Sequence, residues 1–427
     1  MVLSSVAGRT VAFDIGNAVK SALAIDPSLK SGEMKIRSAE SRAAEKKGLL
    51  LPSLNISTSL GAIDQIKPSK SYHRFQNYSV RVSQPVYQAE RWDGYQEAHV
   101  EVRISANQYL QAKEELLYSI ARQFIGICRL KAQQQIYRRS MYYTSQGVER
   151  QKKLFQFGFD SELNLLEATV ELNRYQSKLD VIQRSLHQEA DKFAQITDIS
   201  INTNELKTIE RTEIDPVTLL EISRTGKYWI DAAWTDNLSL RDLLLKKELQ
   251  ELKKNQSYHA LKPTVDISLT HQRSLDFAEE TSHSHSITGS ISFVWNISPF
   301  FTYHNIKAND ANYQAIHFEE IQLKKSIQQE IQQILADIER NRMSLNTFRK
   351  IALQQQEVLK LYLKGFTSKH YSISKVIEAA KADNEIEMNL NQSYFDIWED
   401  AFRLFKAAGR LTEEQMAVLN YFAEYKE

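Results

Sequence analysis

The stretch LLPSLNIS begins at Leu50, and the related stretch LKPTVDIS begins at Leu261, 211 residues later. Four of the eight positions are identical: Leu50 and Leu261, Pro52 and Pro263, Ile56 and Ile267, Ser57 and Ser268. Each stretch opens a run of alternating apolar and polar residues, which is typical of a β-strand. The sequence therefore indicates an internal repeat with a period of about half the 427-residue chain.

The same offset of 211 residues returns far downstream. LFQFGFDSELNLLEA, at Leu154–Ala168, aligns with GFTSKHYSISKVIEA, at Gly365–Ala379, and the two share a phenylalanine, a glutamate and an alanine. Each copy holds a helical segment, two strands, a long helix and a returning helix. We expect a first repeat over 1–211, with strands about 51–60 and 78–87 and a hairpin tip near 158–162. We expect a second over 212–427, with strands about 262–271 and 286–297, a tip near 366–372 and a C-terminal tail.

Composition excludes several classes of protein. Lys and Arg number 54 against 53 Asp and Glu, so the net charge of +1 offers no field that attracts nucleic acid. The one cysteine, Cys128, excludes an internal disulfide and a Cys-rich metal site, and its helical context predicts a small buried apolar residue. No phosphate-binding loop, Ser/His/Asp set or paired-carboxylate site is evident, so we expect neither enzyme activity nor a cofactor.

Four strand patterns alternate between apolar residues and small polar residues. The apolar members include Leu54 and Ile56, Val80 and Val82, Ile267 and Leu269, and Ile291 and Phe293. One interpretation is a soluble sheet with one face on a core; the other is a transmembrane barrel, apolar outside and polar inside. We favour the barrel because Ser, Thr and Asn suit a wet lumen and the long helices are too polar to cover four strands. Four strands cannot close a barrel, for which ~8 is the minimum, so protomers must associate.

Long helices flank these strands. Gln88 to Phe157 has no Pro and only three Gly, and Glu162 to Thr197 forms a returning arm. In the second half, Ile327, Ile331, Ile334 and Ile338 recur at spacings of four, three and four. That spacing predicts a coiled-coil seam, which leaves two faces of the helix exposed to water. A filament or the wall of a water-filled tunnel has this pattern.

The order and spacing of these features resemble the TolC family of bacterial outer-membrane efflux proteins over essentially the whole chain. The resemblance rests on the repeated strand entry, on VSQPVY at the exit of the second strand and on the two aligned tips. It implies an α+β membrane protein: a trimeric 12-stranded outer-membrane β-barrel, four strands per protomer, continuous with a long periplasmic α-helical coiled-coil barrel. It implies as partners two further copies of the chain, outer-membrane lipid, a periplasmic adaptor and an inner-membrane pump such as an ABC transporter. We expect the sequence to be a mature form whose signal peptide has been removed.

The resemblance also implies roles for residues at the tips. It places the pore constriction at Lys375 and Glu378, which share a helix face; the alternative is an ion pair on a solvated face. The residues of the gate tip would be Asn164, Phe366 and Tyr371. The contacts with the adaptor would be Phe157, Gly158, Phe159, Ser368, Lys369 and His370. The sequence departs from the family at Lys369, where Gly is usual, and at Lys375, where acidic residues are typical.

Two hypotheses of function follow. The first is a passive export duct, in which we favour type I protein secretion over small-molecule efflux. The alternative is a soluble coiled-coil scaffold or filament protein with a small β domain, which would stay soluble without detergent.

Two other motifs have a second interpretation. HSH at His283–His285 is a metal-site candidate with His271, and we favour an exposed polar loop. YRRSMYY at Tyr137–Tyr143 mixes basic and aromatic residues, as single-strand nucleic-acid sites do, and we favour a solvated coiled-coil face.

Overall fold

The computed structural model describes residues 13–65, 71–159, 161–202, 206, 215–277, 282–368 and 371–422. The chain forms two compact units. Unit 1 comprises Met1–Lys30, Leu110–Leu238 and Lys324–Glu427, and unit 2 comprises Ser31–Tyr109 and Ser239–Leu323. In the part of the chain that the structure describes, no helix combines the length and apolar character that a membrane crossing requires.

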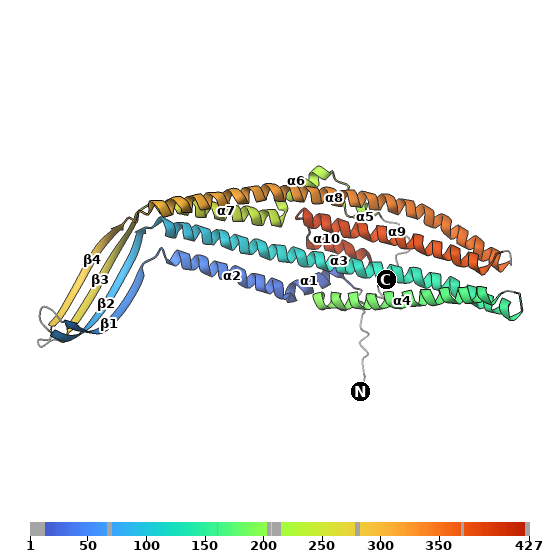
Figure 1. The fold of residues 1–427 in the computed structure, drawn as a ribbon, viewed down its shortest axis with the longest axis horizontal. Coiled ribbons are helices and arrows are strands. Elements are labelled where there is room, and N and C mark those ends of the chain that lie inside the picture. The colour runs from blue at the N-terminus through green and yellow to red at the C-terminus, as the bar shows by residue number, and fades with distance from the viewer. Residues whose placement is uncertain are drawn as a thin grey trace, which may run out of the picture. The chain divides into compact units, whose positions relative to one another are not determined.

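The elements follow one another in a pattern that occurs twice (Figure 1). The first set is α1 (Ile15–Ile25), α2 (Pro27–Gly48), β1 (Ser53–Gln65), β2 (Ser71–Tyr87), α3 (Ala89–Gln156) and α4 (Glu162–Thr197). The second set is α5 (Pro216–Leu219), α6 (Gly226–Asp236), α7 (Leu238–His259), β3 (Thr264–Asp276), β4 (Ser282–Val294), α8 (Pro299–Thr367) and α9 (Ile373–Ala407). The chain closes with α10 (Glu413–Ala417) and the 3₁₀ helix η1 (Val418–Phe422).

The offset of 211 residues is also present in the element bounds. The starts of α2 and α7, of β1 and β3, and of α4 and α9 are each 211 residues apart. The break between α1 and α2 falls at Asp26, with φ −56° and ψ 122°, and the break between α6 and α7 falls at Asn237, with φ −62° and ψ 120°. These equivalences support the internal repeat over 1–211 and 212–427, which stays a prediction.

The sequence predicted the ends of the helices more accurately than the ends of the strands. The returning arm Glu162–Thr197 is confirmed as α4, and the long helix from Gln88 is confirmed as α3. The strands reach further than expected, because β1 continues to Gln65 and β2 already begins at Ser71. Polar and charged residues interrupt the alternation there, whereas backbone pairing between the two strands continues.

Unit 2 contains a four-stranded antiparallel sheet with the order β1-β2-β3-β4 (Figure 1). β2 pairs with both β1 and β3, whereas β1 and β4 each have one neighbour among the described strands. The register between β2 and β3 shifts between Pro85 and Tyr87, where proline has no N–H to donate to the ladder. The Gln88 amide donates to Asp266 Oδ1 at 2.6 Å and so ties the start of α3 to β3.

Unit 1 is built around an aromatic core. Trp398 of α9 lies edge-on to Phe422 of η1, with ring centroids 4.9 Å apart, and Phe124 of α3 packs against Phe193 of α4. All four side chains are fully buried, and each aromatic buries ~150–250 Å². The predicted seam Ile327, Ile331, Ile334 and Ile338 is confirmed as buried, as is Cys128. Burial raises the pKa of the Cys128 thiol, so it stays protonated.

Candidate functional site

The sheet of unit 2 has one apolar and one polar face. Cross-strand pairing aligns Leu54, Val82 and Leu269 in one row, and pairs Ile267 with Ile291 on the same face. On the other face Ser53, Ser83, Ser268 and Ser290 form a row of four serines. Hydroxyls of neighbouring strands in this row are 2.9 Å apart, both between Ser53 and Ser83 and between Ser268 and Ser290. One face of the sheet is therefore suited to an apolar environment and the other face to water.

The apolar face is open in the chain. Ile56, Leu60, Ile287 and Ile291 expose between 72% and 75% of their surface. Large contiguous apolar patches of this kind mark contact with lipid or with another protein. The apolar row is therefore a candidate interaction surface, and the two strand edges beside it have unused backbone donors and acceptors.

Exposed aromatic residues gather where the strands of unit 2 join its helices. The residues are Tyr87, Trp92, Trp295, Phe300, Phe301 and Tyr303. The Trp295 indole N–H donates to the Leu261 carbonyl oxygen at 2.9 Å, which holds the ring outside β4. Rings at such positions are typical of the girdle at a membrane–water interface. Sequence analysis missed these rings, although the aromatic content of SPFFTY at 298–303 was the available signal.

The histidine motif lies in a strand, so the expectation of a loop at His283–His285 was wrong. β4 begins at Ser282, and pairing with β3 brings the His285 ring to 6.4 Å from that of His271. Among the residues that the structure describes, no three potential ligands converge on one point. Backbone pairing extends the strand through these polar residues.

The motif Tyr137–Tyr143 lies inside α3. Tyr142 is exposed, whereas Tyr137 is buried against Tyr175 of α4, with ring centroids 6.2 Å apart. The expectation of a solvated face was therefore wrong for Tyr137, because one side of α3 packs on the returning helix.

The first helical tip is a glycine-dependent turn. Gly158 has φ +70°, its N–H donates to Phe155 O, and the Phe159 N–H donates to Leu154 O, both at 2.9 Å. This left-handed residue ends α3 in a Schellman motif, which glycine adopts without a Cβ clash. The turn exposes 72% of both Phe157 and Phe159.

The other tip residues have different surroundings. The Ser161 hydroxyl caps α4 by accepting from the Asn164 N–H at 3.3 Å, and the Asn164 side chain is half-buried. Ser368 is exposed, whereas Lys369 and His370 lie outside the described residues.

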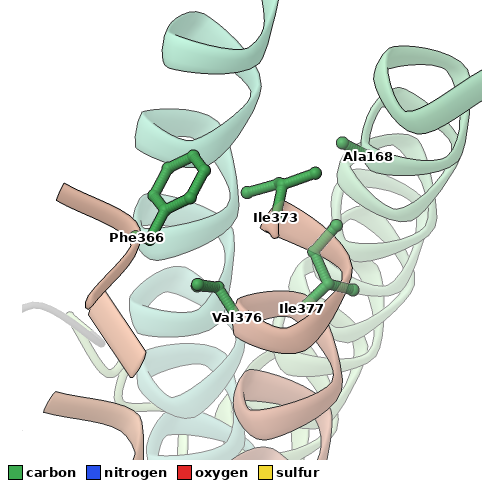
Figure 2. Packing of buried hydrophobic residues seen from close by; sticks show 5 residues of the cluster. All are labelled: Ala168, Phe366, Ile373, Val376 and Ile377. Atoms are coloured by element: carbon green, nitrogen blue, oxygen red, sulfur yellow. The ribbon is translucent and has the colours of Figure 1, made fainter. Parts of the chain in front are cut away.

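Phe366 is buried in a cluster that joins three helices. It exposes 7% of its surface and packs with Ala168, Ile373, Val376 and Ile377 (Figure 2). Gly147 of α3 lies against Ile373, where an added Cβ would be 2.4 Å from its Cδ1 atom. Tyr371, by contrast, is half exposed and lies edge-on to Tyr362 at 5.0 Å. Of the three residues expected at the gate, Phe366 is thus part of the hairpin core and Tyr371 is at the surface.

Lys375 and Glu378 pair with each other on the surface of α9. Nζ and Oε2 are 2.8 Å apart, and 56% and 71% of the two side chains is exposed. The pairing raises the pKa of Lys375 and lowers that of Glu378. The ion pair that was the alternative to a pore constriction is therefore present within one chain. Both charged groups are also exposed enough to contact a neighbouring molecule.

A groove of about 490 Å³ runs beside this pair between α4 and α9. Leu166 and Val170 of α4 line it opposite Ile377 of α9. The buried Glu171 carboxylate in its wall pairs with Lys381 at 2.9 Å and with Arg174 at 3.4 Å. The groove thus offers apolar surface with its charges already compensated.

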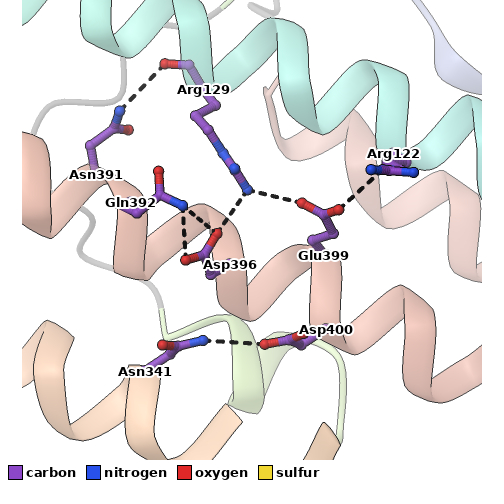
Figure 3. Close-up of polar contacts among 8 residues, drawn as sticks. All are labelled: Arg122, Arg129, Asn341, Asn391, Gln392, Asp396, Glu399 and Asp400. Atoms are coloured by element: carbon purple, nitrogen blue, oxygen red, sulfur yellow. Dashed lines mark hydrogen bonds and ion pairs between the residues drawn. The ribbon is translucent and has the colours of Figure 1, made fainter. Parts of the chain in front are cut away.

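Polar residues join α9 to α3 in unit 1. The Asn384 amide donates to the Ser140 hydroxyl at 2.9 Å, and both residues are buried. Further along, Arg129 pairs with Asp396 at 3.0 Å and with Glu399 at 3.1 Å (Figure 3). Sequence analysis missed these polar contacts of α9. The available signal was the recurrence of polar residues at helical spacing, at Asp383, Asn384, Glu387 and Asn391.

Asp400 lies on the α8 side of the same helix. Its carboxylate accepts a hydrogen bond from the Asn341 amide at 3.2 Å (Figure 3). The pKa of Asp400 is raised to about 6, and burial is the largest cause. The carboxylates of Asp337 and Asp396 also raise this pKa, and each has a larger effect than Arg403, which lowers it. The contact between α8 and α9 therefore contains a carboxylate that ionises reluctantly.

The comparison with protein families identifies the first half of the chain. Residues 18–197 match a family described as outer membrane efflux protein. Over these residues the chain is similar to the outer membrane efflux protein family. The resemblance expected from the repeated strands and the tips is confirmed. No curated protein sequence matches the chain.

Solved structures with the outer membrane efflux fold extend the likeness to nearly the whole chain. A membrane protein from Pseudomonas aeruginosa matches with a TM-score of 0.78 at 14% identity, covering 94% of this chain and 91% of that one. The outer membrane protein VceC from Vibrio cholerae matches with 0.76 at 14%, covering 92% and 96%. The CmeC outer membrane channel from Campylobacter jejuni matches with 0.75 at 13%, covering 93% and 85%. The mostly helical fold with a small antiparallel sheet is therefore that of the efflux proteins.

Asp400 should make the stability of the folded chain depend on pH. Its folded pKa of about 6 lies above the ordinary 3.8, so the protonated form is favoured in the folded state and stability is lost as pH rises from about 4 to 6. We expect Asp400→Asn to raise the denaturation midpoint, measured by circular dichroism, most at pH 8 and progressively less below pH 6. The effect has a ceiling of ~3 kcal/mol.

Asp396→Asn provides the control for this prediction. It removes an ion pair with Arg129 and should lower the midpoint at pH 8. An equal response of Asp400→Asn at pH 4 and pH 8 would contradict the assignment.

Proposed function

We propose that the chain is one protomer of a trimeric export duct in the bacterial outer membrane. The observation that carries the proposal is the two-faced sheet, with an open apolar row, a serine row and a free edge on either side. The family match of residues 18–197 and the fold of the whole chain support the same conclusion.

The sheet edges require a partner. In lipid, each unpaired backbone N–H or C=O costs several kcal/mol, so only a closed barrel is stable there. β1 of one protomer paired with β4 of the next satisfies both edges. Three copies supply twelve strands, with the serine rows facing a water-filled lumen and the aromatic girdle at one membrane surface.

A matched pair of lysine substitutions tests the lipid face. Ile291 and Ser290 are adjacent in β4 and both exposed, but they point to opposite faces. Lysine facing lipid near the midplane costs ~2–4 kcal/mol. Ile291→Lys should therefore sharply reduce the detergent-extracted, heat-resistant oligomer on gels, whereas Ser290→Lys should leave it near the wild-type level. Equal assembly of the two variants would argue for a soluble sheet and for the scaffold alternative.

Cysteine cross-linking tests the edge pairing and the number of protomers. In a Cys128→Ser background, cysteine at Ser57 of β1 combines with cysteine at Ser284, Ser286 or Ser290 of β4, on the same face of the sheet. One of these registers should yield a covalent trimer on oxidation. Ser57→Cys with Ile287→Cys or Ile291→Cys is the control, since those side chains point to opposite faces. A stable monomer in detergent would contradict the duct.

The helical tips are proposed as the docking site of a periplasmic adaptor, which connects the duct to an inner-membrane pump. Phe157 and Phe159 support this because a turn held by Gly158 presents both rings outward. Ser368 joins them in the proposal together with Lys369 and His370 of the second tip. We propose a polypeptide cargo of the type I class, supported by the altered second tip; a small-molecule pump as the native partner would contradict that cargo.

Lys375 and Glu378 are proposed to form charged rings at the pore constriction, near the gate residues Asn164, Phe366 and Tyr371. Exposure of both groups beside the α4–α9 groove supports this position. Three lysines at a mouth disfavour cations, because charged rings set pore selectivity. Lys375→Asp should therefore shift the reversal potential in planar bilayers toward cation preference, and Lys375→Gln should shift it partway.

Lys360 provides the matched control for the selectivity measurement. It forms an equally exposed pair with Glu357 on α8, at 2.7 Å. Lys360→Asp should leave selectivity unchanged. If Lys375→Asp behaves in the same way as Lys360→Asp, the constriction lies elsewhere.

A further inference from the structure

A hollow of about 430 Å³ lies in unit 1, and its lining includes none of the tip residues and neither member of the charged pair. The segment from Leu219 to Trp229 forms one wall, and Phe405, Arg410 and Val418 form the other. Its lining combines aromatic rings with two arginines, a composition that none of the features described above explains.

Two guanidinium groups converge on one phenol in this hollow. Arg224 and Arg410 both donate to the Tyr228 hydroxyl, and their Cζ atoms lie 4.5 Å and 5.1 Å from its ring centroid. A neutral hydroxyl accepts hydrogen bonds but does not neutralise two positive charges. Because each guanidinium has five N–H donors, both retain donors for a further acceptor.

Carboxylates compensate these charges unequally. Arg410 Nε pairs with Asp236 at 3.1 Å, whereas Arg224 Nη2 lies 3.7 Å from Glu221, whose side chain is 80% exposed. Glu414, also exposed, is a further acid in the lining. Arg410 is thus paired through Nε, whereas Arg224 is only loosely paired and has the most donors left for an anion.

Trp229 contributes an aromatic ring to the same lining. It is 3% exposed, and its indole Nε1 is buried without a hydrogen-bond partner among the described residues. The ring is held edge-on to Tyr228 at 5.4 Å and to Phe405 at 5.7 Å. Because Nε1 is itself buried from solvent, Trp229 contributes its ring, not its N–H, to the wall of the hollow.

We propose that this hollow binds a small molecule that carries one carboxylate on an apolar or aromatic body. The carboxylate accepts from Arg224 and Arg410, in the charge-assisted geometry that guanidinium favours. The apolar body packs against Phe405, Leu220 and Val418. The proposal does not depend on the duct.

Ligand-observed ¹⁹F NMR on the purified full-length protein, in whichever oligomeric state it is isolated, tests the proposal. The probe is 4-(4-fluorophenyl)butanoate, and unlabelled 4-phenylbutanoate is the competitor. The probe signal should broaden with protein and sharpen again with the competitor. The alcohol 4-phenylbutan-1-ol has the same apolar body without charge, so it reports partition into detergent and should fail to compete. Equal competition by the alcohol would overturn the proposal.

Variants locate the binding. Arg224→Gln with Arg410→Gln should weaken binding at least ~10-fold, since hydrogen bonds to charged groups contribute ~1.5–3 kcal/mol. Trp229→Phe keeps an aromatic ring in the wall and should leave binding near the wild-type level. Arg403→Gln is the matched control, because Arg403 is an α9 arginine paired with Glu330 outside the hollow.

The single variant Arg224→Gln keeps the test decisive if the double variant misfolds. Arg224 is half exposed and leaves the bond between Arg410 and Asp236 in place. Wild-type affinity in folded Arg224→Gln would show that the arginines do not bind the carboxylate.

Discussion

Unpaired backbone at the two edges of the sheet is the constraint on which the proposed assembly depends. A four-stranded sheet with β1 and β4 at its margins presents two rows of donors and acceptors, and its apolar face is largely exposed. Water would satisfy the edges but not the apolar face, and lipid would satisfy that face but not the edges. Both conditions are met when copies of the chain close the sheet into a barrel. In the proposed duct, oligomerisation therefore follows from the strands themselves.

The helices of unit 1 use two kinds of contact with different roles. The aromatic core around Trp398 and the isoleucine seam of α8 bury apolar surface, which is the main source of stability. α9 also contacts α3 through polar groups, as between Asn384 and Ser140. Such buried polar pairs add little net stability, but they penalise any shift in which a partner is lost. The register of such a helix is defined, and its contacts can include a titratable group such as Asp400, whose pKa is raised.

The tips combine a fixed backbone with exposed side chains. Gly158 in the left-handed region ends α3, and the cluster around Phe366 closes the second hairpin from within. Phe157 and Phe159 therefore stand on a turn that costs little further entropy to order when a partner binds. The charged pair on α9 and the groove beside it lie on the same unit and leave charge and apolar surface available to neighbouring chains.

Much of the fold was evident from the sequence, because it follows from local periodicity. The alternation in four short runs predicted the strands, the lack of proline predicted α3, and the isoleucine spacing predicted a buried seam. Strand ends were placed less well, because ladder pairing continues through polar residues such as His283 and His285, where alternation stops. Side-chain roles at the tips were the least accessible: Lys375 and Glu378 share a face by spacing alone, whereas Phe366 is buried only because α4 and α9 meet it.

Tertiary structure alone decided which distant residues meet. Arg224 and Arg410 are separated by most of the second half of the chain, yet both reach Tyr228. No periodicity encodes such a hollow, because it arises where non-repeating segments pack together. The sequence by itself determined which residues can face lipid, water or a helical seam, since that depends on spacing of two or about 3.6 residues. Packing decided which polar groups are paired, which ionise less readily and which can still bind a ligand. These properties depend on contacts between segments far apart in the chain.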